Sequence, residues 1–510
     1  MSRKTGVVLS YVLMILEVLS TLLLTPFIIR NLGGAEYGVF KLAAAISSYL
    51  LLLDLGVGNA VTRFLSKYRT TGQYDLSRKF LGISILFYSG ISLITLMVGS
   101  VLVFLFPSIF ATGLTVAEIR RGQILLAFTT ANAAVTLGTT CYSNGVIAYE
   151  RFDVSRGAAI LQILVRIVMT VVVLKQDMGS VGIVTVNLLT TLICRGFYIW
   201  FILGKLRLRP MFRGIDSKLL KEVIGYSAYI LIQMVATQIN VFADSVLLGI
   251  LVPSSAALIA VYSIGQQISQ YYQTIGTSVN GVLMPGVVRM VEQGTLASQL
   301  EDEMVRIGRM IFCILGAIYV GFLLFGRQFI VLWVGAENLE GYWVALLLLT
   351  ANLFILTEAI GTQILWARNE HREQALLKMG IVVVNIVLTV VLIRWKPIIG
   401  AALGTFISLM LGDVGVMNYV FYRKLGLNIK RYYQRLASGI VPSLLIGAVA
   451  GWLLRWLALP GWLGLLSSIL AFMLVYGCAM LWFGFNSYEK RFLRRMLKRD
   501  RKLSEKLGED

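Results

Sequence analysis

Long apolar runs recur from one end of this chain to the other, and they constrain the fold more than any other feature. A helix needs about 20 apolar residues to cross the hydrocarbon core of a bilayer. The runs are continuous and not alternating, which predicts membrane-spanning helices and excludes barrel strands. We expect about fourteen spans, near residues 7–29, 38–60, 80–106, 121–146, 157–174, 181–203, 223–250, 257–282, 308–326, 341–366, 375–393, 399–421, 437–457 and 462–484.

Composition excludes a soluble protein of this length. Hydrophobic residues make up 57% of the 510 residues and charged residues only 14%. We therefore predict an all-α polytopic membrane protein. The net charge of +20 is unevenly distributed, because alternate loops carry about 34 Lys and Arg on the side that holds both termini and about 8 on the other. This asymmetry predicts that both termini are cytoplasmic, and it argues against nucleic acid as a partner.

An internal repeat divides the chain into two related halves. Residues 169–174 match residues 388–393 at an offset of 219, and residues 204–208 meet residues 423–427 at the same offset. Each half holds six predicted spans, an even number, so both halves enter the membrane in the same direction. This predicts two six-helix lobes related by a parallel pseudo-twofold repeat, with the substrate path between the lobes.

The predicted organisation has five parts. They are an N-lobe, a basic cytoplasmic loop, a C-lobe, two additional spans and a basic cytoplasmic tail, at residues 1–203, 204–222, 223–432, 433–486 and 487–510. The tail has apolar residues on a helical period among its cations. We therefore expect the tail to lie on anionic lipid of the inner leaflet.

Two short motifs accompany the first two spans. Residues 32–40 read Leu-Gly-Gly-Ala-Glu-Tyr-Gly-Val-Phe, and residues 54–64 read Asp-Leu-Gly-Val-Gly-Asn-Ala-Val-Thr-Arg-Phe. With the topology, they resemble the polysaccharide transport (Wzx-type flippase) family of the MOP exporter superfamily, which also contains the MATE drug exporters and the lipid II flippases. The resemblance implies a twelve-helix core with two appended helices. It also implies transport of an undecaprenyl-diphosphate-linked oligosaccharide across the bacterial inner membrane, beside other polysaccharide-assembly membrane proteins.

Ionisable residues inside the predicted spans are few, and a charge there is costly enough to indicate function. Arginine presents paired donors that suit a phosphate or an acidic sugar, so we assign Arg166 and Arg195 to the substrate. The resemblance agrees, since cationic cavity residues are thought to engage the anionic headgroup in that family. The acids suit a coupling proton or cation, and they are Glu17, Asp244, Glu358 and Asp413. The alternative is that these charges form structural ion pairs with each other.

Polar stripes follow the fifth, seventh and eighth spans at helical spacing. A polar stripe in lipid must face protein or water, so we expect a water-filled cavity that binds sugar hydroxyls. Hydrogen bonding between helices is the alternative. With the two arginines, the predicted substrate-binding residues are Gln162, Gln233, Asn240, Gln266, Gln273 and Asn280.

We also predict a cytoplasmic gate, formed by Asp54, Arg63, Glu150 and Arg151. Simple solvated charged turns are the alternative for the last two. No metal, cofactor or catalytic residue is expected, because the chain has a single histidine and its four cysteines lack metal-ligand spacing.

The predicted function is a flippase that works by alternating access, with a lipid-linked glycan and a coupling proton or cation as ligands. A MATE-like cation-coupled drug or metabolite antiporter would share the fold and the acids but need no basic cavity. A membrane glycan polymerase or glycosyltransferase is less favoured, because the outer loops near residues 107–120 and 327–340 are short and no Asp-X-Asp pair lies in a cytoplasmic loop. We therefore expect no enzyme activity.

Overall fold

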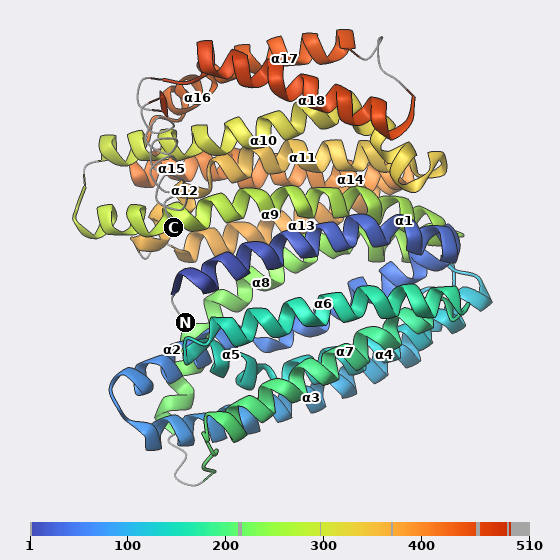
Figure 1. The fold of residues 1–510 in the computed structure, drawn as a ribbon, viewed down its shortest axis with the longest axis vertical. Coiled ribbons are helices and arrows are strands. Elements are labelled where there is room, and N and C mark those ends of the chain that lie inside the picture. The colour runs from blue at the N-terminus through green and yellow to red at the C-terminus, as the bar shows by residue number, and fades with distance from the viewer. Residues whose placement is uncertain are drawn as a thin grey trace, which may run out of the picture. The chain divides into compact units, whose positions relative to one another are not determined.

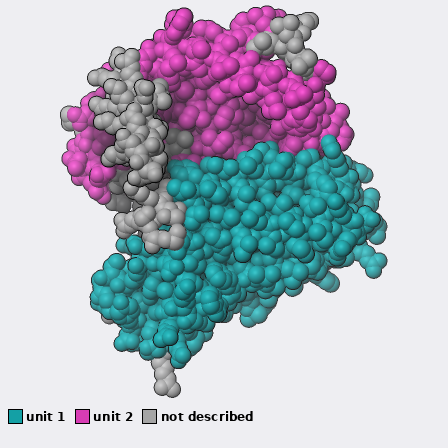
Figure 2. Space-filling model, viewed as in Figure 1, with its two compact units in different colours: residues 1–266, 375–408 teal, residues 267–374, 409–510 magenta. Residues whose placement is uncertain are grey.

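The computed structural model describes residues 3–212, 217–295, 297–368, 371–454, 460–486 and 489–490. Every regular element in these ranges is a helix, as predicted. Most of the predicted tail and residues 213–216 of the predicted inter-lobe loop lie outside the described residues. The chain forms two compact units (Figure 2). Unit 1 holds residues 1–266 and 375–408, and unit 2 holds residues 267–374 and 409–510.

Unit 1 contains the helices from α1 to the beginning of α9 and most of two later ones (Figure 1). They are α1 (Arg3–Leu50), α2 (Val57–Thr70), α3 (Tyr74–Ile109), α4 (Val116–Gly138), α5 (Thr140–Ala148), α6 (Phe152–Lys175), α7 (Gly179–Trp200), α8 (Ser217–Leu251), the beginning of α9 (Ala256–Glu292), α13 (His371–Ile393) and α14 (Pro397–Leu409). Within this unit α3 packs along α4, α6 packs along α7, and α1 contacts α4, α6 and α8.

Unit 2 contains the remainder of α9 and the later helices other than α13 and α14, most of which belong to unit 1. They are α10 (Ala297–Val334), α11 (Gly341–Thr357), α12 (Ala359–Ala367), α15 (Met417–Leu425), α16 (Ile429–Ala437), α17 (Ile440–Leu454) and α18 (Gly461–Ala479). Short 3-10 or π segments adjoin the longer helices of both units, at η1 (Leu51–Asp54), η2 (Phe201–Lys205), η3 (Ala336–Asn338), η4 (Met410–Val416) and η5 (Met480–Gly484).

The described helices make this a multi-pass membrane protein. Nine are long and apolar enough to cross a bilayer, or up to twelve if each of three bent pairs is one span. The first candidate, Val8–Asp54, has 47 residues, and at 1.5 Å per residue it measures about 70 Å, more than twice the hydrocarbon thickness. Its backbone leaves the helical conformation at Gly33 (φ 76°, ψ 165°). This run therefore contains the first predicted span from Val8 onward and the second as far as Asp54, whereas residues 57–60 of the second belong to α2. α9 covers the predicted span near 257–282.

Helix boundaries repeat along the chain at the offset that the sequence predicts. α5 begins at Thr140 after a 41° bend from α4, and α12 begins at Ala359 after a 43° bend from α11. These two starts are separated by the repeat offset of 219 residues. Equivalent spans of the two halves thus break at equivalent positions, which agrees with the predicted register of the repeat.

The motif at residues 32–40 builds a junction among helix ends in unit 1. Oε1 of Glu36 accepts hydrogen bonds from the backbone N–H and the hydroxyl of Ser180, at 2.7 and 2.6 Å, and Arg121 pairs with the same carboxylate. The carboxylate thereby caps the first turn of α7. Gly38 lies directly against α9, since a Cβ at this position would be 1.7 Å from the carbonyl oxygen of Ala256. In this structure the motif therefore serves packing.

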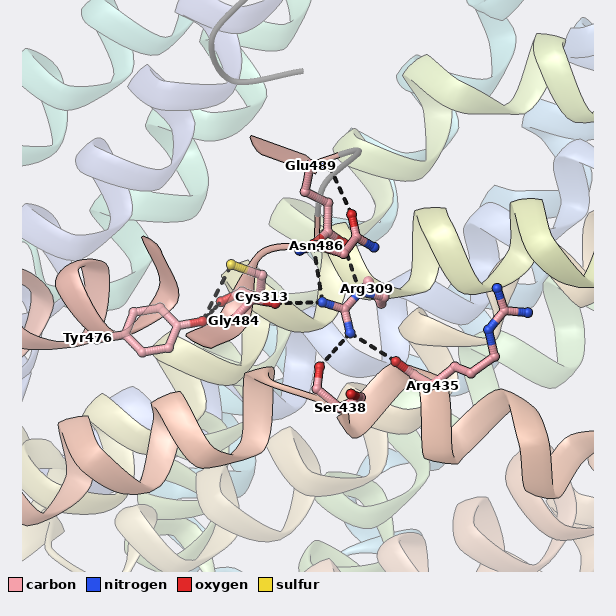
Figure 3. Close-up of polar contacts among 8 residues, drawn as sticks. All are labelled: Arg309, Cys313, Arg435, Ser438, Tyr476, Gly484, Asn486 and Glu489. Carbon is pink, nitrogen blue, oxygen red and sulfur yellow. Dashed lines mark hydrogen bonds and ion pairs between the residues drawn. The ribbon is translucent and has the colours of Figure 1, made fainter. Parts of the chain in front are cut away.

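Arg309 joins the C-terminal helices of unit 2 to α10 (Figure 3). Its side chain is 5% exposed, and it donates to the carboxylate of Glu489 at 2.8 and 3.1 Å. It also donates to the backbone carbonyls of Arg435, Ser438 and Gly484, at 2.9, 2.6 and 2.7 Å. These five bonds use all five guanidinium N–H groups. One buried side chain thus fixes the end of α16, the turn before α17 and the end of η5.

Candidate functional site

Four helical spans of unit 1 converge on one buried carboxylate. Asp244 in α8 is 0% exposed. Its Oδ1 accepts a hydrogen bond from Thr389 of α13 at 3.0 Å, and its Oδ2 accepts one from Thr405 of α14 at 2.5 Å. The hydroxyl of Tyr262, on α9, also donates to Oδ2. No ion pair in the described part of the chain includes Asp244. The carboxylate therefore has hydroxyl donors but no counter-charge there.

Amide groups complete this cluster. Asn385 is 1% exposed, and its Nδ2 donates to Oδ1 of Asn240 at 3.0 Å and to Thr405 at 3.2 Å. Its Oδ1 lies 3.0 Å from the hydroxyl oxygen of Thr389, whose single proton is shared between this amide and Asp244. Gln266 donates to the backbone carbonyl of the residue that follows Asn240 in α8. Carboxylate, amide and hydroxyl oxygens are the groups that hold hard cations such as sodium, and a carboxylate also takes a proton.

The equivalent place in the first half is built differently. The repeat offset aligns Arg166 in α6 with Asn385, and Arg166 interacts electrostatically with Glu17 of α1, a helix that packs along α6. The first half thus supplies a cation that interacts with an acid exposed on α1. In the second half an asparagine replaces that cation, and Asp244 is left without one among the described residues.

The other predicted residues of unit 1 form separate contacts. Arg195 donates to the hydroxyl of Ser143 at 2.9 Å, and Gln162 donates to that of Thr191 at 3.4 Å. Gln162 also borders a largely apolar cavity of about 440 Å³ between α6 and α7, with lining residues that include Val154, Ala158, Leu161, Ile193 and Phe197. The lining suits hydrocarbon and not a sugar.

The two units divide the predicted substrate residues between them. Unit 1 holds Gln162, Arg166, Arg195, Asn240 and Gln266. Gln273 and Asn280 lie farther along α9 in unit 2, where Asn280 donates to the carbonyl of Leu356 at 3.3 Å. The side chain of Gln233 lies outside the described residues.

Two of the predicted ion-coupling residues come together in unit 2. Glu358 is 2% exposed at the bend between α11 and α12. Its Oε1 accepts from Nδ2 of Asn418 at 2.8 Å and from the hydroxyl of Tyr433. Asp413, in η4, is 9% exposed and acts electrostatically on Glu358. Neither Glu17 nor Asp244 belongs to this cluster.

The predicted gate residues all lie in unit 1. Asp54 accepts a hydrogen bond from Tyr88 at 2.8 Å. Glu150 is 3.9 Å from Arg69, and Arg151 pairs at 3.0 Å with the aspartate two residues after it. The fourth, Arg63, is exposed on α2.

The partners of Asp244 were not predicted from the sequence. Thr389 and Thr405 lie in apolar spans and bond to a residue far away along the chain. One signal was present, because Asn385 and Thr389 are four residues apart and share a face of an otherwise apolar helix. A polar pair of this kind indicates an internal partner.

Several solved membrane-protein structures have a similar fold. The chain is similar to lipid II flippase MurJ in an inward closed conformation, with a TM-score of 0.70, 15% sequence identity, and coverage of 93% of this chain and 97% of that chain. It is also similar to an inward-facing multidrug resistance MATE family transporter of the MOP superfamily, with a TM-score of 0.64 and 13% sequence identity. That match covers 81% of this chain and 96% of that chain. The MATE multidrug transporter DinF-BH in complex with R6G is similar with a TM-score of 0.59 and 15% sequence identity. The match covers 83% of this chain and 96% of that chain. These likenesses show the two-lobe fold of MOP transporters.

Sequence comparison gives the family. A search of curated proteins finds no match. The family model described as "Polysaccharide biosynthesis protein" matches residues 4–291, more than half of the chain. The chain therefore belongs to the polysaccharide biosynthesis protein family and is a polysaccharide-transport member of the MOP superfamily.

Proposed function

We propose that this protein is a flippase that moves an undecaprenyl-diphosphate-linked oligosaccharide across the bacterial inner membrane by alternating access, coupled to a proton or a cation. Membership of the polysaccharide biosynthesis protein family is the observation that carries the proposal. The fold adds support, since it resembles a lipid II flippase and transporters. No catalytic step is included, because these relatives by structure are transporters.

A MATE-like antiporter is the second candidate, since the fold and the buried acids would serve it equally. Coverage favours the flippase. The MurJ structure matches 93% of this chain and the MATE structure 81%. This difference is close in size to the two spans predicted beyond the repeat, at residues 433–486. A drug transporter built on twelve helices has no need of such a pair.

We place the coupling ion at Asp244. A buried carboxylate without a counter-charge is costly, and a bound proton or sodium ion offsets that cost. The hydroxyls of Thr389 and Thr405 bring α13 and α14 to the same carboxylate as α8. Cation binding would therefore stabilise one packing of these helices, and release would favour another. Glu17, Glu358 and Asp413 belong to the proposed ion-coupling set as well.

We place the anionic headgroup at Arg195 in preference to Arg166. Arg166 interacts electrostatically with Glu17. Arg195 donates one described hydrogen bond, to Ser143, and a guanidinium has further N–H groups for phosphate oxygens. The amides of the polar stripes would bind sugar hydroxyls. The lobes proposed to alternate are residues 1–203 and 223–432, with both termini and the joining loop in the cytoplasm.

Deletion of the gene, followed by fractionation of lipid-linked intermediates, tests the function. A flippase defect leaves complete repeat units on the cytoplasmic leaflet, and the wild-type chain restores export. Unchanged glycan with altered drug tolerance would instead support the antiporter. Intermediates that stop short of a complete unit would contradict both and indicate an enzyme.

A further inference from the structure

A second cluster of buried oxygen atoms surrounds the bend between α11 and α12 in unit 2. The bend interrupts helical hydrogen bonding, and side chains supply replacements. Asn280 of α9 donates to the carbonyl of Leu356 at 3.3 Å, and Tyr432 of α16 donates to the carbonyl of Thr357 at 2.8 Å. Glu358 follows directly in the chain. The backbone of the bend is therefore satisfied by its neighbours, as irregular backbone inside a membrane must be.

Several side-chain oxygens at the bend have no hydrogen-bond donor among the described residues. Oε1 of Glu358 accepts from Asn418 and Tyr433, but its Oε2 is buried without a hydrogen-bond partner among the described residues. The side-chain oxygens of Asn280 and Asn418 are also buried, and neither has a hydrogen-bond partner among the described residues. Asp413 adds a second carboxylate. Acceptors thus outnumber donors around a residue that is 2% exposed.

The described ion pairs of the neighbouring elements do not reach Glu358, since Arg431 and Arg435 of α16 pair with Glu301 and Asp302. No ion pair in the described part of the chain includes Glu358. The buried cation of α10, Arg309, gives all five N–H groups to Glu489 and three carbonyls. Where α10 meets the bend it presents Gly308, at which a Cβ would lie 3.1 Å from a carbonyl oxygen of the bend.

The titratable groups that act on Glu358 are therefore acids and phenols. Asp413 comes from η4, and Tyr432 and Tyr433 come from α16. None of these groups carries a positive charge. Oε2 of Glu358 therefore has neither a hydrogen-bond donor nor a counter-charge among the described residues.

We infer that the bend holds a second monovalent cation, a proton or a sodium ion, bound by Glu358 with Asp413 and the adjacent amide oxygens. Either ion supplies the missing positive charge and engages the unpartnered Oε2. Asn418 and Tyr433 already donate to Oε1, which leaves too few carboxylate oxygens for a divalent ion. Because Tyr433 lies on α16, binding at this site stabilises the contact between the bend and that helix. The site is separate from Asp244, which lies in unit 1.

The inference rests on the ion coupling proposed above and specifies it for Glu358. Binding to the purified full-length chain tests it without any glycan, so its failure can be told apart from failure of the flippase proposal. The probe is radiolabelled sodium, with choline as the replacing ion, in the Asp244→Asn background that removes the first site. Thermal unfolding in choline at a neutral and at a mildly acidic pH reports a bound proton, because a proton held only by the folded state stabilises it as the pH falls.

If the ion is sodium, the Asp244→Asn variant retains sodium binding and the Asp244→Asn/Glu358→Gln variant loses it. If the ion is a proton, acidification raises the Tm of the first variant by about 2 °C or more relative to the second. Glu340→Gln is the matched control, an exposed acid at the opposite end of α11, and it should leave both signals unchanged. Asp413→Asn replaces Glu358→Gln if the latter does not fold. Identical behaviour of the single and double variants in both assays would overturn the inference.

Discussion

Thr405 donates a hydrogen bond of 2.5 Å to Oδ2 of Asp244, although 161 residues separate them in the chain. The bond joins α14 to α8, the last and the first long spans of the second half. Thr389 of α13 completes the link through the other carboxylate oxygen. A ligand that competes for this carboxylate therefore acts on three spans at once. This arrangement is the basis for placing the coupling ion at Asp244.

Removal of one competing hydroxyl should tighten cation binding at Asp244 without unfolding the protein. A hydrogen bond to a charged group contributes about 1.5–3 kcal/mol and here favours the cation-free carboxylate, so Thr405→Val should lower the cation concentration needed for half-maximal export by about 10-fold or more. Ser408→Ala is the control, because that hydroxyl bonds within its own helix. Equal cation dependence in the two variants would argue against a cation at Asp244.

Two glycines of the motif at residues 32–40 should respond differently to the same substitution. At Gly38 a Cβ would lie 1.7 Å from a backbone oxygen of α9, whereas at Gly34 the nearest atom is 4.0 Å away. Backbone cannot move aside as a side chain does. Gly38→Ala should therefore abolish accumulation of folded protein in the membrane, and Gly34→Ala should not. Size-exclusion profiles of both variants in detergent give the answer, and normal folding of Gly38→Ala would refute the close approach.

Loss of Arg309 should be more damaging than loss of an exposed arginine on the same helix. Arg309→Met leaves Glu489 and three carbonyls without their donor, and breaking a buried pair costs about 3–5 kcal/mol. The control is Arg306→Met, whose pair with Glu303 is more exposed and is expected to contribute less than about 1 kcal/mol. We expect a clear drop in Tm for the first variant and little change for the second. Equal Tm values would show that the cluster in Figure 3 contributes little to stability.

The Glu17 and Arg166 charges should depend on each other. Glu17→Gln leaves the arginine without its compensating acid, so this variant should accumulate poorly in membranes. A second change, Arg166→Gln, removes the excess charge and should restore accumulation. Quantitative blotting of membrane fractions provides a double-mutant cycle. Purely additive losses would mean that the electrostatic contact is unimportant.

Much of the fold could be predicted from the sequence because its determinants are local. Each span is an apolar run, and the offset of the repeat was visible in the sequence before the helix bends reproduced it. The break at Gly33 lies between the first two predicted spans, which end at residue 29 and begin at residue 38.

The candidate site was predicted less completely, because its contacts are distant in sequence. Intramembrane charge identified Asp244 and Glu358 correctly as buried residues. Their partners are ordinary hydroxyls and amides, and nothing local in the sequence marks them. Arg309 was overlooked for a related reason, since three of its acceptors are backbone carbonyls. Carbonyl positions depend on where helices end and not on residue type.

Reconstituted transport tests the central claim most directly. The purified chain is placed in vesicles that contain an undecaprenyl-diphosphate-linked glycan and carry a sodium or proton gradient, and a lectin outside measures how much glycan reaches the outer leaflet. We expect transfer with the wild-type chain that depends on the gradient, and transfer at the level of protein-free vesicles with Asp244→Asn. Wild-type vesicles that behave like protein-free ones under both gradients would contradict the assignment as a flippase.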